Sequence, residues 1–213
     1  MLTTASDPVT IPFRRNRLLQ GLAVLLAVGW LIAAIGPENR LDWFLENLLV
    51  FLTVGLLAYF HRRWPLSDMS YILITVFMLL HLVGSHYTYA KMPMGFWLQD
   101  YFSLARNHYD RVIHFCFGLL IVYPVREFLH RYSGAGRGLS AFTAFTTIAM
   151  LSGGYEIIEW IVAIIVSPEA AIAYLGTQGD LFDAQKDSAL AICGSILGLL
   201  LTKRFFAPPV QGR

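Results

Sequence analysis

Residues 18–36 read LLQGLAVLLAVGWLIAAIG, a stretch without a charged side chain. A helix of ~20 apolar residues crosses a hydrocarbon core about 30 Å thick, and this stretch has the required length. Arginines precede it, as in a signal peptide, but it ends at Gly36-Pro37-Glu38 and has no small-x-small cleavage pattern. The sequence therefore predicts an uncleaved first transmembrane helix.

Comparable apolar stretches follow along the rest of the chain. Of its 213 residues, 56% are hydrophobic and 14% are charged, whereas soluble domains carry roughly 25% charged residues. Such a chain cannot cover a water-facing surface. We predict an all-α integral membrane bundle of about six transmembrane helices, forming a single domain over residues 1–213. The predicted spans are approximately 18–36, 45–61, 69–87, 110–130, 139–166 and 184–206.

The distribution of basic residues predicts the orientation of the bundle. With both termini in the cytoplasm, the cytoplasmic side holds eleven of the 16 lysines and arginines, including Arg204 and Arg213. Cytoplasmic loops are the ones enriched in these residues. The net charge of +2 gives no reason to expect nucleic acid, so the expected partner is the lipid bilayer. The outer loops hold Arg40, Lys91, Arg106, Arg111 and Lys186.

Two predicted outer loops, 88–109 and 167–183, are longer than simple turns. The first is rich in aromatic residues, among them Phe96, Trp97 and Tyr101. Aromatic side chains concentrate at membrane interfaces, so a short amphipathic segment lying on the outer membrane surface would explain them. A lid over an external cavity is the alternative.

Ionisable residues gather toward the outer ends of four predicted spans. Charged groups inside a membrane are costly and usually face the bundle interior or a water-filled cavity. Spacings of three and four residues place pairs of these side chains on shared helix faces. The sequence therefore predicts one polar pocket open to the extracytoplasmic side, built by His81, His86, Asp110, His114, Glu156, Glu159, Asp183 and Asp187.

Neighbouring carboxylates in hydrocarbon need a partner, because like charges and desolvation both oppose ionisation. Arg106, Arg111 and Lys186 are candidate partners for Asp110, Glu159 and Asp187. Protons are a second possibility, and a divalent metal is a third, since imidazole nitrogen with carboxylate oxygen suits zinc, manganese or iron. The expected metal ligands are His81, His86, Asp110, His114, Asp183 and Asp187.

Other interpretations of single features stay open. His81 alone would also fit a core histidine bonded to a carbonyl group. The last span continues its polar stripe with Ala191, Gly194 and Gly198. Small residues at this spacing permit close helix packing, either within the bundle or against another subunit.

Three functions follow from the pocket. A metal-dependent enzyme would act on a lipid or envelope precursor, with metal-bound water as nucleophile and Glu156 or Glu159 as general base. A carrier would move an ion or small solute while its glutamates take up and release protons. A non-catalytic envelope protein would use the charges only to hold its helices together.

Several strings resemble the YjdF-type family of bacterial inner-membrane proteins. They are residues 80–89, LHLVGSHYTY, residues 106–111, RNHYDR, residues 176–180, GTQGD, and residues 183–187, DAQKD. The resemblance covers most of the chain. It implies location in the bacterial inner membrane and a multi-pass topology, and it implies no particular activity.

The last three spans also resemble VanZ-like membrane proteins, which are associated with teicoplanin resistance. The string 110–115, DRVIHF, matches their Asp-basic-x-x-His-Phe opening, and Asp187, Gly194 and Gly198 match their last helix. Glu156 and Glu159 stand where that family tends to have Glu-x-x-Gln, while Ala191 and Leu181 replace an expected Asn and Arg. The resemblance implies an outward-facing polar site in these helices.

Overall fold

The computed structural model describes residues 12–203, which form helices and connecting loops without a strand. Five of the helices are long and apolar enough to cross a membrane, and α1 is an apolar helix of 17 residues. The predicted all-α membrane bundle is confirmed. The long helices are α1 (Arg17–Ala33), α2 (Arg40–Arg63), α3 (Asp68–His86), α5 (Tyr109–Tyr132), α6 (Arg137–Ile165) and α8 (Asp183–Leu201). The short elements are η1 (Phe13–Arg15), α4 (Pro93–Phe102) and α7 (Pro168–Leu175).

The predicted spans agree with these helices apart from their ends. The largest shift is at α2, which begins at Arg40, because the side chain of Asn39 accepts hydrogen bonds from the backbone amides of Leu41 and Asp42 and caps the helix there. The end of the predicted span 184–206 beyond residue 203, together with Arg204 and Arg213, lies outside the described residues.

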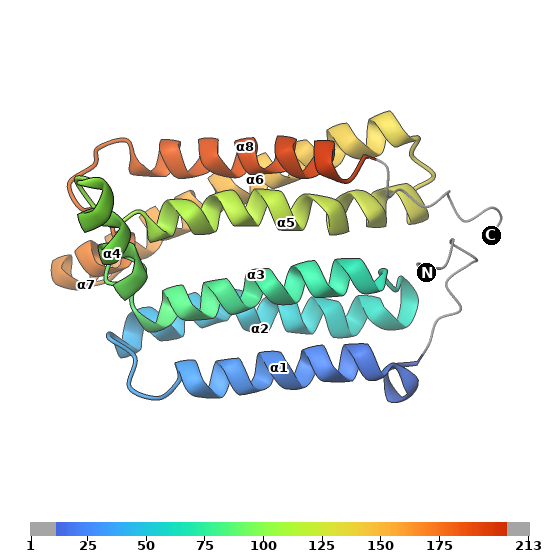
Figure 1. The fold of residues 1–213 in the computed structure, drawn as a ribbon, viewed down its shortest axis with the longest axis horizontal. Helices are drawn as coiled ribbons and strands as arrows, with labels where there is room; N and C mark the ends of the chain where they lie inside the picture. Colours follow the sequence, from blue (N-terminus) through green and yellow to red (C-terminus); the bar gives the residue numbers. More distant parts are fainter. Residues whose placement is uncertain (1–11, 204–213) are drawn as a thin grey trace.

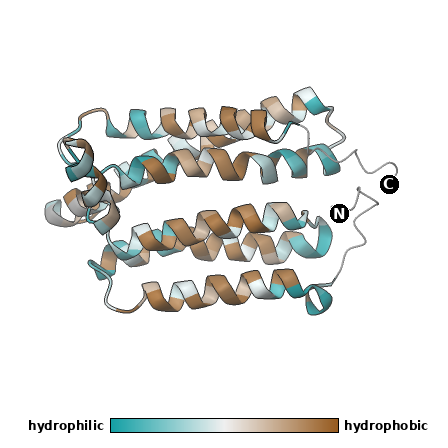
Figure 2. Cartoon of the chain, viewed as in Figure 1, coloured by the Kyte–Doolittle hydropathy of each residue, from teal (hydrophilic) through white to brown (hydrophobic). Residues whose placement is uncertain are grey.

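The helices form two groups joined at the centre of the bundle (Figure 1). The first three long helices pack on one side and α5, α6 and α8 on the other, with α3 and α5 in contact between them. Both short helices α4 and α7 lie at one end, which we call the outer end, while α1 begins and α8 ends at the opposite end. Apolar residues occupy the middle of the long helices and hydrophilic residues their ends (Figure 2), as expected for a membrane bundle.

Each long outer loop contains a short helix. The predicted interfacial segment in 88–109 is α4, where Trp97 and Tyr101 are 74% and 82% exposed. The helix α7 in the second loop was not predicted from the sequence. It is α7 and the residues directly after α3, and not α4, that border the cavity described below.

Helices α5 and α8 form the closest contact of the bundle. A Cβ atom placed on Gly194 would collide with the carbonyl oxygen of Phe115, and one on Gly118 would collide with that of Ala191. Gly198 likewise lies against the backbone of Leu119. The small residues of α8 therefore pack within the bundle, which answers the question that the sequence left open.

At the inner end, Glu127 of α5 joins α5 to the start of α3. Its carboxylate accepts hydrogen bonds from the backbone amide of Ser67 at 3.0 Å, from the Ser67 hydroxyl at 2.8 Å and from the Ser70 hydroxyl. Arg131, one turn further along α5, pairs with the same carboxylate at 2.9 Å. These residues, the Glu127 cluster, satisfy a carboxylate that is only 3% exposed.

Candidate functional site

Two loops lock together at the outer end. The backbone amide of Asn107 donates to the side chain of Gln178 at 3.0 Å, and Gln178 returns a hydrogen bond to the carbonyl of Asn107 at 2.9 Å. Arg106 donates to the carbonyl groups of Thr177 and Gly176. The strings 106–111 and 176–180, far apart in sequence, therefore form one scaffold that fixes the starts of α5 and α8.

The basic residues of this scaffold bind two aspartates. Asp183 receives hydrogen bonds from Arg106 and Arg111, and Asp180 receives them from Arg111 and Lys186. Hydrogen bonds from Lys186 hold the pKa of the Asp180 carboxyl well below its usual value. Asp180 and Asp183 are thereby neutralised.

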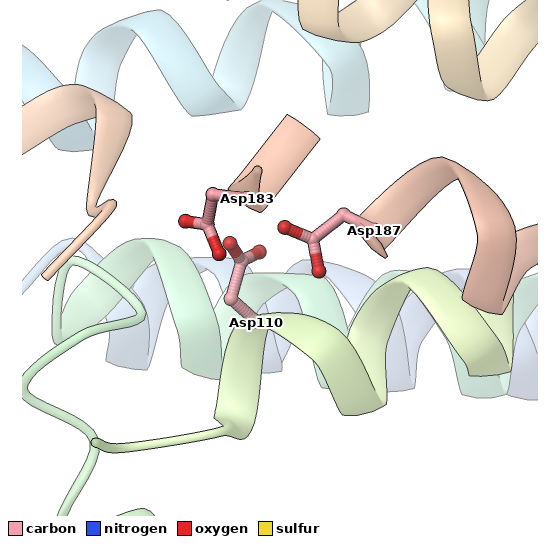
Figure 3. A group of neighbouring side chains, drawn as sticks. All are labelled: Asp110, Asp183 and Asp187. Carbon is pink, nitrogen blue, oxygen red and sulfur yellow. The ribbon is translucent and has the colours of Figure 1, made fainter. Parts of the chain in front are cut away.

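The nearby carboxylates of Asp110, Glu156 and Asp187 accept no hydrogen bond from a lysine or arginine of the described residues, although Asp183 lies beside them. Asp110, Asp183 and Asp187 turn their carboxylates toward one another from α5 and α8 (Figure 3), with oxygen atoms within 4.8 Å. On the α6 side, Glu156 Oε1 lies 3.4 Å from His114 Nε2, and Asp110 Oδ1 lies 3.7 Å from the same nitrogen. We call Asp110, His114, Glu156 and Asp187 the outer cluster.

A cavity of about 430 Å³ opens beside the outer cluster. Its floor is formed by Phe77 and Phe117 at the centre of the bundle, and its outer end is covered by Tyr174, Leu175 and Gly176 at the end of α7. Burial raises the pKa of the Tyr174 phenol, which keeps this group protonated. The polar residues of the lining are Glu46, His81, Thr88, Tyr89, Asp110, His114, Ser152, Tyr155, Glu159 and Tyr174.

His81 is held in one protonation state at the wall of this cavity. Its Nε2 lies 3.1 Å from the carbonyl oxygen of Glu46, so Nε2 must carry the proton. The hydroxyl of Tyr89 then donates to Nδ1 at 2.5 Å. Burial raises the pKa of the Tyr89 phenol well above its usual value, so it remains a donor. Both ring nitrogens of His81 therefore have hydrogen-bond partners. This agrees with the alternative prediction of a core histidine bonded to a carbonyl group.

The structure brings most of the predicted site residues together but separates others. Asp110, His114, Glu156 and Asp187 meet in the outer cluster, and Glu159 lies next to it in the cavity wall. Asp183 adjoins the cluster but is held by arginines. His86 lies elsewhere: its Nδ1 donates to the carbonyl of Ala33 at 3.0 Å, which ties α3 to α1. The predicted pairing of lysine and arginine with Asp110 and Glu159 is not among the ion pairs of residues 12–203.

Glu46 is an acidic residue of the cavity lining that the sequence analysis missed. Glu46 is 3% exposed and accepts a hydrogen bond from the Tyr155 hydroxyl at 2.7 Å, which links α2 to α6 across the cavity. Asp42, one turn earlier, is also buried. Their spacing of four residues was a usable signal, because it places both carboxylates on one face of α2.

Comparisons with known proteins agree with the membrane fold. Residues 18–207 match the family of predicted membrane proteins DUF2238. The inner membrane protein YjdF of Escherichia coli (strain K12) is 35% identical over 189 residues, which are 88% of this chain and 90% of that protein. No solved structure is significantly similar to the chain. The likeness to VanZ-like proteins is not tested by these matches and stays a prediction.

The scaffold strings 106–111 and 176–180 thus belong to a chain whose whole membrane bundle has a relative in the bacterial inner membrane. The protein is embedded in that lipid bilayer by its apolar helices. The chain belongs to the DUF2238 family of predicted membrane proteins.

Proposed function

We propose that this protein binds an amphiphilic, lipid-like molecule that enters its cavity from the outer leaflet of the membrane. The observation that carries the proposal is the division of the cavity into a polar outer part and an apolar deeper part. Along α2, Glu46 precedes Leu49 and Leu52, and along α6, Leu151 and Met150 lie deeper than Glu159. A membrane lipid has the same order of polarity along the bilayer normal.

The apolar part of the cavity opens sideways between α2 and α6. Leu52 on one side and Met150 and Ile158 on the other all line the cavity and are more than half exposed. In a bilayer such side chains face the acyl chains. A hydrocarbon chain can therefore pass from the bilayer into the cavity without crossing water.

The polar part fits a headgroup that donates hydrogen bonds. Glu46, Glu159 and Asp110 supply carboxylate oxygens, and no lysine or arginine lines this cavity within residues 12–203. A phosphate group would find no lysine or arginine in this lining, whereas hydroxyl or amine groups would find acceptors. The volume of about 430 Å³ falls within the usual range of ligand pockets. It accommodates a headgroup and part of one chain, with the remaining hydrocarbon left in the bilayer.

The proposal is tested by photocrosslinking in nanodiscs. Diacylglycerol, whose hydroxyl headgroup carries no phosphate, is given a photoreactive group in one acyl chain and added to the full-length protein, and crosslinked peptides are identified by mass spectrometry. We expect crosslinks on the α2 and α6 residues that line the cavity. Met150→Trp, which fills the mouth, should abolish them, and Ile157→Trp should not, since Ile157 is equally lipid-facing but does not line the cavity. Crosslinks spread evenly over all lipid-facing helices, or unchanged in Met150→Trp, would refute the proposal.

A further inference from the structure

The arginine and lysine side chains at the outer end lie closer to Asp180 and Asp183 than to the carboxylates of the outer cluster. Arg106 and Lys186 contact only Asp183 and Asp180 among the acidic side chains of residues 12–203. Arg111 also contacts these two, and its Nε stays 4.0 Å from Asp187 Oδ1, beyond hydrogen-bond distance. Three further carboxylates, those of Asp110, Glu156 and Asp187, lie close to one another or to His114, and none accepts a hydrogen bond from a lysine or arginine of residues 12–203.

Two oxygen atoms of the outer cluster have no hydrogen-bond donor within the described part of the chain. They are Oδ1 of Asp187, a residue only 2% exposed, and Oε1 of Glu156. Both atoms point into the cluster and not toward bulk water. A buried, unsatisfied carboxylate oxygen is costly, and native proteins leave few of them. Arg111 Nε, 4.0 Å from Asp187 Oδ1, is likewise without a hydrogen-bond partner, so both oxygen atoms are free to bind a cation without breaking a hydrogen bond.

Two distances in the cluster, both from His114 Nε2, match those between the ligands of a metal ion. A tetrahedral ion with ligand bonds of ~2.1 Å holds its donor atoms about 3.4 Å apart. His114 Nε2 lies 3.4 Å from Glu156 Oε1 and 3.7 Å from Asp110 Oδ1. Asp187 comes within 4.8 Å of Asp110. An ion bound by His114, Glu156 and Asp110 would draw Asp187 in from this separation.

The other nitrogen of His114 is also suitably placed. Nδ1 lies 3.4 Å from the hydroxyl oxygen of Ser152, a residue that is 2% exposed. With its proton on Nδ1, His114 donates to Ser152 and presents the lone pair of Nε2 to the carboxylates. Histidine ligands are commonly oriented by such a second hydrogen bond.

We propose that Asp110, His114, Glu156 and Asp187 bind one divalent transition-metal cation of the zinc, manganese or iron class. One nitrogen and three oxygen donors suit these metals. The set differs from the ligands predicted from the sequence: it includes Glu156, and it omits Asp183, which the arginines hold, and the two engaged histidines, His81 and His86. The site borders the lipid cavity through Asp110 and His114, but it forms without any lipid.

Equilibrium dialysis of the full-length protein with Mn²⁺ tests this site. We expect about one bound equivalent in the unmodified protein. Glu156→Gln and Asp187→Asn should each weaken binding about tenfold or more, since each removes a ligand. Glu38→Gln is the control, because it removes a carboxylate that pairs with Lys91 and not with the arginines beside the outer cluster, so it should leave binding unchanged. Thermal unfolding of each variant shows that it is folded.

Pulsed electron paramagnetic resonance of the bound Mn²⁺ adds a readout that is specific for the ligand. A nitrogen coupling from imidazole should be present in the unmodified protein and absent in His114→Gln. No Mn²⁺ binding, binding unaffected in Glu156→Gln, or binding lost in Glu38→Gln would each overturn the assignment. Met150→Trp should bind Mn²⁺ normally, so failure of the lipid proposal and failure of the metal proposal remain distinguishable.

Discussion

The two ends of α5 carry buried carboxylates that differ in how many hydrogen-bond donors surround them. At the inner end, Glu127 accepts hydrogen bonds from Ser67 and Ser70 and pairs with Arg131. At the outer end, Asp110 meets Asp187 on α8 and, with Glu156 from α6, surrounds His114. The same helix thus holds one carboxylate with a full set of donors and one in a group that lacks them.

This difference separates a structural role from a binding role. A buried carboxylate with a full set of hydrogen-bond donors contributes to folding. Its oxygen atoms have no lone pair left to bind a ligand. A buried group with orphan oxygens costs folding energy, and such a cost is typical of sites that are completed by something else. The outer cluster, and not the Glu127 cluster, is therefore where a ligand is expected.

The largest effect should come from separating α8 from α5. Gly194→Leu places a side chain against the backbone at Phe115, which cannot move without displacing α5. Overpacking against a rigid neighbour costs typically 1–3 kcal/mol, and we expect about 3 kcal/mol or more here. Thermal unfolding in detergent should show a strongly lowered midpoint, and Asp187 should leave the outer cluster with α8. Gly55→Leu is the control, since nothing lies within 4 Å of that position. Equal effects of both substitutions would contradict the packing described.

Paired glutamate substitutions test the comparison directly. Glu127→Gln removes hydrogen bonds to a charged group and leaves Arg131 unpaired, so it should destabilise the protein by about 2 kcal/mol. Glu156→Gln, measured with a chelator present, should change stability by less than about 1 kcal/mol and in the stabilising direction, because it removes like-charge repulsion. The measurement is the unfolding midpoint of each variant. If Glu156→Gln were the more destabilising change, the outer cluster would be structural.

The sequence was sufficient to predict the helices because each span is a local pattern. The apolar stretch 18–36 predicts α1, and the aromatic residues of 88–109 predict an interfacial segment where α4 lies. The start of α2 was harder to locate, because its first turns contain Asp42 and Glu46, and their polarity resembles that of a loop.

The depth of each polar residue was also predictable, but its partners were not. Helix periodicity places His81 and His86 near the outer end of α3, yet one faces the cavity and the other faces α1. Which of two nearby side chains turns inward depends on how α3 packs against three other helices. Similarly, no local pattern assigns Arg106 to Asp183, because 77 residues separate them.

The smallest effect on stability is expected from Asp180. Unlike Glu127 and the outer cluster, this acidic residue lies in the outer loop and not in the bundle. Lys186 and Arg111 lower its pKa in the folded protein, so its contribution to stability is fully present above the ordinary aspartate pKa of about 4. The contribution is lost as the pH falls through the lower value of the folded state. The difference in unfolding midpoint between the unmodified protein and Asp180→Asn should therefore be constant near neutral pH and shrink in acid.

Two further observations make the Asp180 test specific. Glu38→Gln removes an exposed pair with Lys91 and should shift the midpoint little at any pH, since surface ion pairs contribute ~0–1 kcal/mol. In Asp180→Asn, Arg111 loses one of its two close acidic partners, and its Nε already lies 4.0 Å from Asp187. The guanidinium should then turn toward the outer cluster and weaken Mn²⁺ binding there. An Asp180→Asn protein that binds Mn²⁺ as tightly as the unmodified protein would show that Arg111 is held in place by Asp183 alone, and that the cluster does not depend on how its neighbours share the available cations.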